Sequence, residues 1–132
     1  MTQAAGRGSN PAAEREAPLV LIVEDDPDTA ELIARCLGEV GYQTLRAADG
    51  EQAISISSGR RISLVLLDWR LPGHLCGRPL LQRLRTEHGA PVVVISADPA
   101  SLTEASDAGA ADYLPKPFRL TDLVHVVDEH CR

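Results

Sequence analysis

"LVLIVEDDPDTAELI" (Leu19–Ile33) places five apolar residues directly before three acidic ones. A continuous apolar run of this length, followed by a helical pattern, is typical of a strand buried on both faces of a parallel sheet. Asp26 and Pro27 have the form of a helix N-cap and a first helical residue. Glu24 and Asp25 then lie at the end of a buried strand, where like charges repel one another unless a positive group offsets them.

The same alternation of apolar run and helical pattern continues along the chain. Apolar runs at 62–67 and 91–95 end in Asp68 and Ser96, and shorter, more polar strands are predicted at 42–46 and 112–114. Helices are predicted at about 27–40, 49–58, 79–87 and 99–108, and a last one carries Leu120, Leu123, Val124 and Val127 on one face. This pattern predicts an α/β fold with a five-stranded, parallel, doubly wound sheet.

Length and composition narrow the functional classes. The 132 residues suit one domain, predicted at 18–132, after an N-terminal tail at 1–17 rich in small and polar residues. The net charge of -6 argues against binding nucleic-acid backbones. Three widely spaced cysteines form no disulfide framework or zinc motif and suit the reducing cytoplasm. No apolar run has the length of a membrane span, so we expect a cytoplasmic domain.

Polar side chains stand where the predicted strands end. They are Glu24 and Asp25, then Asp68, Ser96 and Lys116, and Lys116 is the only lysine among 13 Lys and Arg residues. In open parallel sheets, sites form beyond the carboxyl ends of the strands. If the first and third strands are neighbours, the carboxylates converge and one lysine does not balance them. A divalent cation would, and carboxylate oxygens with water suit Mg²⁺.

Four segments in order carry a resemblance to a known family: "VLIVEDDP" (20–27), "LVLLDWRLPG" (64–73), "VVVISA" (92–97) and "GAADYLPKPF" (109–118). The chain resembles the receiver domains of bacterial two-component response regulators. The resemblance implies a flavodoxin-like strand order of 2-1-3-4-5. It also implies that the domain takes a phosphoryl group from a phosphohistidine donor and then switches a partner-binding surface.

The resemblance assigns the acceptor and the metal ligands. Asp68 corresponds to the phospho-acceptor. Asp25 and Asp68 would bind Mg²⁺ directly, with Mn²⁺ as a substitute, together with the backbone carbonyl of Arg70. Glu24 would act through a metal-bound water.

The resemblance also assigns the residues around the phosphoryl group. Ser96 and Lys116 would bind its oxygens, and Ser96 and Tyr113 would form the switch. The Lys116–Pro117 peptide bond corresponds to a cis bond in the family. Arg70 and Asp98 border the approach of the water that hydrolyses the acyl phosphate. We expect Arg70 to obstruct that water by reaching a phosphoryl oxygen, Glu24 or Asp98, rather than to assist it.

Other functions remain as alternatives. A phosphohydrolase of the haloacid-dehalogenase type needs a second Asp two residues after the nucleophile, where this chain has Arg70. A degenerate receiver acting as a constitutive interaction module usually lacks an acid or the lysine, and this chain has them all. Nucleotide or flavin binding would need a glycine-rich loop after the first strand, which this chain lacks.

The resemblance also implies partners. The phosphoryl donor would be a sensor histidine kinase or a histidine phosphotransfer protein. A downstream protein, or a second copy in a homodimer, would bind the face formed by the helix at 99–108, the strand at 112–114 and the last helix. The domain would be no enzyme beyond its own phosphorylation and dephosphorylation, and would bind neither nucleic acid nor membrane directly.

Overall fold

A computed structural model describes residues 17–131, so the tail predicted at 1–17 lies, except for Ala17, outside the described residues. Five parallel strands form one sheet in the order β2-β1-β3-β4-β5. They are β1 (Leu19–Val23), β2 (Gln43–Ala47), β3 (Leu64–Asp68), β4 (Val92–Ser96) and β5 (Asp112–Pro115). The predicted fold class and strand order are confirmed.

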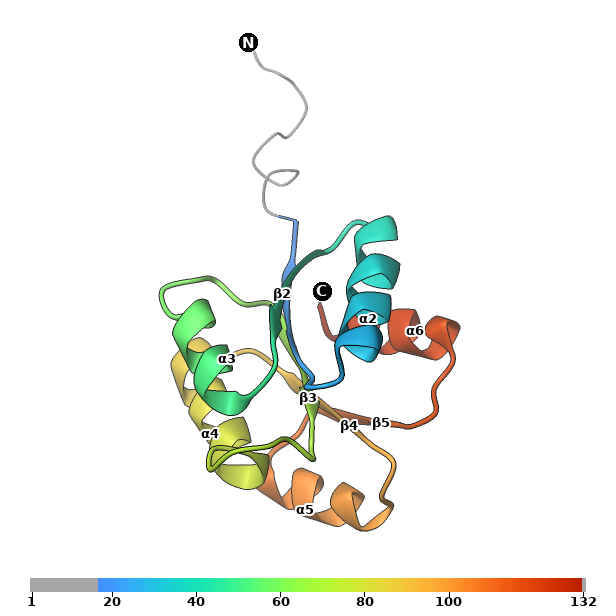
Figure 1. The fold of residues 1–132 in the computed structure, drawn as a ribbon. Helices are drawn as coiled ribbons and strands as arrows, with labels where there is room; N and C mark the ends of the chain where they lie inside the picture. The colour runs from blue at the N-terminus through green and yellow to red at the C-terminus, as the bar shows by residue number, and fades with distance from the viewer. Residues whose placement is uncertain (1–16, 132) are drawn as a thin grey trace.

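Helices cover both faces of the sheet. They are α2 (Pro27–Glu39), α3 (Gly50–Ser57), α4 (Gly77–His88), α5 (Ala100–Ala108) and α6 (Leu120–His130). One face carries α2 and α6, and the other carries α3, α4 and α5 (Figure 1). No helix in the described part of the chain is both long enough and apolar enough to cross a membrane.

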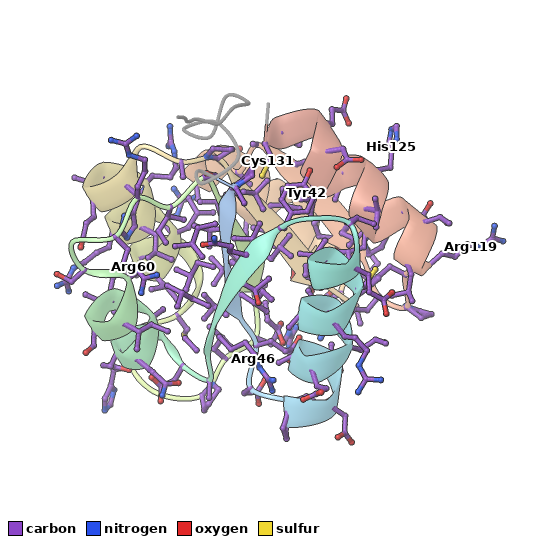
Figure 2. All side chains as sticks on the ribbon, turned by 90° about the horizontal axis from the view of Figure 1, so that it is seen from above. Tyr42, Arg46, Arg60, Arg119, His125 and Cys131 are labelled. Carbon is purple, nitrogen blue, oxygen red and sulfur yellow. The ribbon has the colours of Figure 1, made fainter. Side chains whose placement is uncertain are left out.

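The central strands supply the core for both layers. Every residue of β1, β3 and β4 is buried, and alternate side chains point to opposite faces. Leu21 and Val23 pack in the cluster under α3, α4 and α5, whereas Val20 and Ile22 pack in the cluster under α2 and α6. Each such side chain contributes about 1.5–3 kcal/mol through burial. Side chains fill the space between sheet and helices, whereas Arg119 and His125 point outward (Figure 2).

The last helix buries a face that differs from the predicted one at its first residue. Leu123, Val126 and Val127 are buried on α6, whereas Leu120 is 40% exposed. Leu120 is the first residue of the helix, and Phe118 in the preceding loop is partly buried against the core cluster under α2 and α6. The prediction that Leu120 shares the buried face is therefore wrong, because its side chain stays exposed at the start of the helix.

The ends of the strands set the position of the polar residues. Strand β3 includes Asp68 and begins at Leu64, two residues later than predicted, although Ser63 N already donates a hydrogen bond to Leu19 O at 2.8 Å. Val23 pairs with Leu67, so the residues that follow β1 lie beside Asp68. The carboxyl ends of β1, β3 and β4 therefore meet at one edge.

Candidate acidic phosphoryl and metal site

Three carboxylates converge at this edge. Glu24, Asp25 and Asp68 each offer an oxygen, and these oxygens lie within 4.8 Å of one another. Glu24 and Asp68 are only 4% and 6% exposed, whereas Asp25 is exposed. The exposed Asp25 leaves one side open to water. A site with only oxygen donors and room for water fits Mg²⁺, which retains several waters when it binds proteins.

Lys116 is the positive group in contact with this cluster. Its Nζ lies 3.0 Å from Glu24 Oε1 and 3.3 Å from Asp68 Oδ2. Burial alone would lower the pKa of Lys116, but the hydrogen bond to Glu24 and the charges of Asp68 and Glu24 raise it above its ordinary value. The ammonium is therefore charged at neutral pH. Lys116 N donates to Ser96 O at 2.9 Å, and the Lys116–Pro117 peptide bond is cis.

The pKa of Glu24 is raised by burial. Loss of solvent raises the pKa of Glu24 to about 7, and the hydrogen bond and charge of Asp68 act in the same direction. The hydrogen bonds from Lys116 and from Asp26 N, at 3.2 Å, act in the opposite direction without cancelling the rise. A cation at the carboxylates would favour the ionised form of Glu24.

Asp68 is oriented by donors on both oxygens. Arg70 N donates to Oδ1 at 3.0 Å, and Lys116 Nζ donates to Oδ2 at 3.3 Å. Arg70 is thereby placed directly beside the carboxylate. The role of the Arg70 carbonyl as a metal ligand stays a prediction.

The hydroxyl at the end of β4 belongs to a small network. Ser96 is 2% exposed, and its Oγ accepts from Asp98 N at 3.1 Å and donates to Ser101 Oγ at 3.0 Å. The Tyr113 hydroxyl donates to Ser96 O at 3.2 Å and to Asp98 O at 3.1 Å. Ser101 was not predicted as a site residue, because serines are common in the first turn of a helix and the sequence alone does not show its contact with Ser96.

Arg70 and Asp98 meet at the rim of the site. Arg70 Nη2 forms an ion pair with Asp98 Oδ2, and the two side chains are 69% and 36% exposed. The hydrogen bond from Ala100 N, followed by the one from Arg70, lowers the pKa of Asp98. A cleft of about 310 Å³ beside them is lined by Asp68, Arg70, Ser96, Ala97, Asp98 and Lys116. Of the predicted partners of Arg70, the structure therefore places Asp98 against it.

Comparison with known proteins identifies the family. Residues 20–128 match the family model described as "Response regulator receiver domain". The chain belongs to the response regulator receiver domain family. The resemblance to receiver domains of two-component response regulators, drawn from the sequence motifs, is confirmed.

Individual relatives agree with this assignment. The chain is 38% identical over 129 residues to the transcriptional regulatory protein TcrA of Mycobacterium tuberculosis, covering 92% of this chain and 49% of that protein. It is 37% identical over 107 residues to the DNA-binding response regulator MtrA of Mycolicibacterium smegmatis, covering 80% and 46%. The chain thus spans about half the length of these relatives. The receiver domain of NtrX from Brucella abortus has a TM-score of 0.79 at 33% identity, covering 85% of this chain and 97% of that one.

The raised pKa of Glu24 predicts a pH-dependent stability in metal-free protein. The protonated form stabilises the fold fully below about pH 4.5, and this contribution is lost as the pH rises through about 7. Glu24→Gln stays neutral, and Asp68 still pairs with Lys116. We expect the free energy of unfolding, measured with urea and a chelator, to match wild type near pH 4 and exceed it near pH 8 by on the order of 1–3 kcal/mol.

The exposed Glu87 supplies the matched control, because Glu87→Gln removes the same charge from a solvated helix surface. The difference in the free energy of unfolding between Glu87→Gln and wild type should be the same at both pH values. A Glu24→Gln variant that is less stable than wild type near pH 8 would contradict the electrostatic assignment.

Proposed function

We propose that this receiver domain accepts a phosphoryl group on Asp68 from a phosphohistidine donor, with Mg²⁺, and thereby changes a partner-binding surface. One observation carries the proposal: the Lys116 ammonium contacts both Glu24 and Asp68 beside the exposed carboxylate of Asp25. Carboxylates with a cation and an ammonium can neutralise a phosphoryl group during in-line transfer. Acidic residues gathered without that chemistry would only destabilise the fold.

The convergence of the carboxylates supports the metal ligands that the family resemblance implies. Asp25 and Asp68 would bind Mg²⁺ or Mn²⁺ directly, with the Arg70 carbonyl as a third protein ligand and Glu24 acting through a water. When bound, the cation supplies positive charge for the phosphoryl oxygens. The three carboxylates are close enough to share one ion, and the hydrogen bond from Arg70 N to Asp68 places the Arg70 backbone beside them.

The protein residues would divide the transfer among them. An Asp68 oxygen attacks phosphorus as the bond from phosphorus to the donor histidine nitrogen breaks, and the histidine leaves as the neutral imidazole after protonation. Lys116 turns from the free carboxylate to a phosphoryl oxygen, and the Ser96 hydroxyl donates to another. The domain would catalyse only this transfer and the later hydrolysis of its own acyl phosphate.

The switch would run from Ser96 to the surface. When Ser96 moves toward the phosphoryl group, the loop from Ser96 to Asp98 moves with it. The carbonyl of Asp98 accepts a hydrogen bond from the Tyr113 hydroxyl, so this movement reaches Tyr113. Tyr113 lies on β5 between α5 and α6, the elements of the proposed output face. Leu102 on α5 is 49% exposed there, which suits contact with a downstream protein or with a second copy of the domain.

Two other functions are less well supported. A constitutive interaction module does not need Lys116 to pair with two buried carboxylates. A haloacid-dehalogenase-type hydrolase needs an acid where Arg70 stands. We propose a sensor histidine kinase or a histidine phosphotransfer protein as the donor, and no direct contact of this domain with nucleic acid, in view of its net charge of -6.

Metal binding is the first test. Trp69 is the only tryptophan, is 9% exposed and adjoins Asp68, so its emission should change as Mg²⁺ binds. Binding to the folded state alone should raise the free energy of unfolding by about 2.7 kcal/mol at a hundredfold excess over the Kd. Fluorescence titration and thermal melting measure both effects. Asp25→Asn is the control that should weaken both, and an unchanged wild-type melting curve would refute the metal site.

Phosphoryl acceptance is the second test. We expect a small phosphodonor with Mg²⁺ to add one phosphoryl group, because the Asp68 carboxylate is the nucleophile. Asp68→Asn should abolish the adduct in intact-mass measurements, since an amide is neutral and a poor nucleophile. Asp26→Asn is the matched control, because Asp26 caps α2 and Asn caps equally well. Full phosphorylation of Asp68→Asn would exclude the assigned acceptor.

The lifetime of the acyl phosphate is the third test. We propose that the Arg70–Asp98 pair obstructs the hydrolytic water, because it spans the rim of the cleft above Asp68. Arg70→Ala and Asp98→Ala should then lose the phosphoryl group several-fold faster than wild type. The decay of the phosphorylated mass measures this rate, with Arg83→Ala on the exposed surface of α4 as the control. Slower decay in Arg70→Ala would mean that the guanidinium assists hydrolysis.

A further inference from the structure

Ser101 is a buried hydroxyl that the proposed reaction leaves without a role. Ser96 and Ser101 are each only 2% exposed, and the Ser96 hydroxyl donates to Ser101 Oγ at 3.0 Å. Burying a hydroxyl costs free energy unless it is hydrogen-bonded, and in this contact each of the two hydroxyls has the other as a partner. The two residues come from different elements, the end of β4 and the first turn of α5.

The backbone fixes Ser101 in this position. Ser101 N donates to Asp98 O at 3.0 Å, and Asp98 N donates to Ser96 Oγ at 3.1 Å. The short loop between Ser96 and α5 is therefore closed by hydrogen bonds at both ends. Ser101 Oγ cannot follow Ser96 without disturbing the start of the helix.

Ser96 has a single proton to donate, so two acceptors compete for it. One is Ser101 Oγ, which takes it in this structure, and the other is the phosphoryl group that would be bound on Asp68. The Tyr113 hydroxyl does not compete, because it donates to the backbone carbonyls of Ser96 and Asp98 and not to the Ser96 side chain.

We propose that Ser101 is a positioning residue that holds the Ser96 hydroxyl away from the phosphoryl site until the domain is phosphorylated. The inference rests on the proposed function, since it needs Ser96 to bind the phosphoryl group. When the contact breaks, the Ser101 hydroxyl loses the hydrogen bond that Ser96 donates to it. The free energy of that lost bond weakens the binding of the phosphoryl group by the same amount. Ser101 thereby biases the switch toward its unphosphorylated state and ties that bias to the first turn of α5.

The test uses beryllofluoride with saturating Mg²⁺, a mimic of the phosphoryl group on a carboxylate, and measures its Kd by calorimetry. Ser101→Ala removes the competing acceptor, so beryllofluoride should bind about 3-fold to 10-fold more tightly, the range of one net hydrogen bond. Ser57→Ala is the matched control: Ser57 is equally buried, on α3, and bonds to Ile54 O and His88 instead. Its Kd should equal that of wild type, and Mg²⁺ alone should bind all three proteins equally.

A double-mutant cycle separates positioning from general packing. In the Ser96→Ala background the competition no longer exists, so adding Ser101→Ala should leave the beryllofluoride Kd unchanged. Ser101→Cys, with a similar shape and a weaker acceptor, should show the same tightening to a smaller degree and serves if the alanine variant is unstable. Equal or weaker binding by both Ser101 variants, or an equal effect in both backgrounds, would overturn the inference. A wild-type protein that binds no beryllofluoride at all would instead refute the proposed function.

Discussion

The contact of one ammonium with two buried carboxylates is the constraint on which this structure depends. Glu24 follows β1, and Asp68 ends the adjacent strand β3. Both side chains are too buried for water to solvate their charges. Lys116 directly follows β5, the strand at one edge of the sheet, and its side chain reaches both carboxylates. The contact is available only because β1 lies next to β3 and β4 lies between β3 and β5. The strand order, the buried apolar strands and the acidic edge are thus parts of one electrostatic arrangement.

The same contacts form a continuous route from Asp68 to the helix layer. Lys116 bonds to Asp68 through its side chain and to Ser96 O through its backbone. Ser96 in turn bonds to Ser101 on α5, and its carbonyl accepts from Tyr113 on β5. Phosphorylation of Asp68, as proposed, would first change the partners of Lys116 and Ser96, and Ser96 is hydrogen-bonded to the start of α5 through Ser101. Coupling then needs only local exchanges of hydrogen bonds.

Much of this was predictable from the sequence. Buried strands of a parallel sheet are continuous apolar runs, and their carboxyl ends share one edge, which brings Glu24, Asp25 and Asp68 together. The family motifs supplied the strand order. The partner of Ser96 was not predictable, because a contact between two hydroxyls depends on where α5 begins. The buried face of α6 was misjudged at Leu120 for the same reason: periodicity gives the spacing of a face but not the residue at which packing starts.

The choice of lysine at position 116 follows from geometry rather than from charge alone. The ammonium nitrogen lies 3.0 Å from a carboxylate oxygen of Glu24, which follows β1, and 3.3 Å from one of Asp68, which ends β3. A compact ammonium can donate in several directions at once, whereas a planar guanidinium favours two parallel bonds to one carboxylate. Arginine here would form an ion pair with one acid and leave the other buried without a cationic partner. A chain that otherwise uses arginine for every positive side chain therefore has its single lysine where two separate acids must be neutralised by one group.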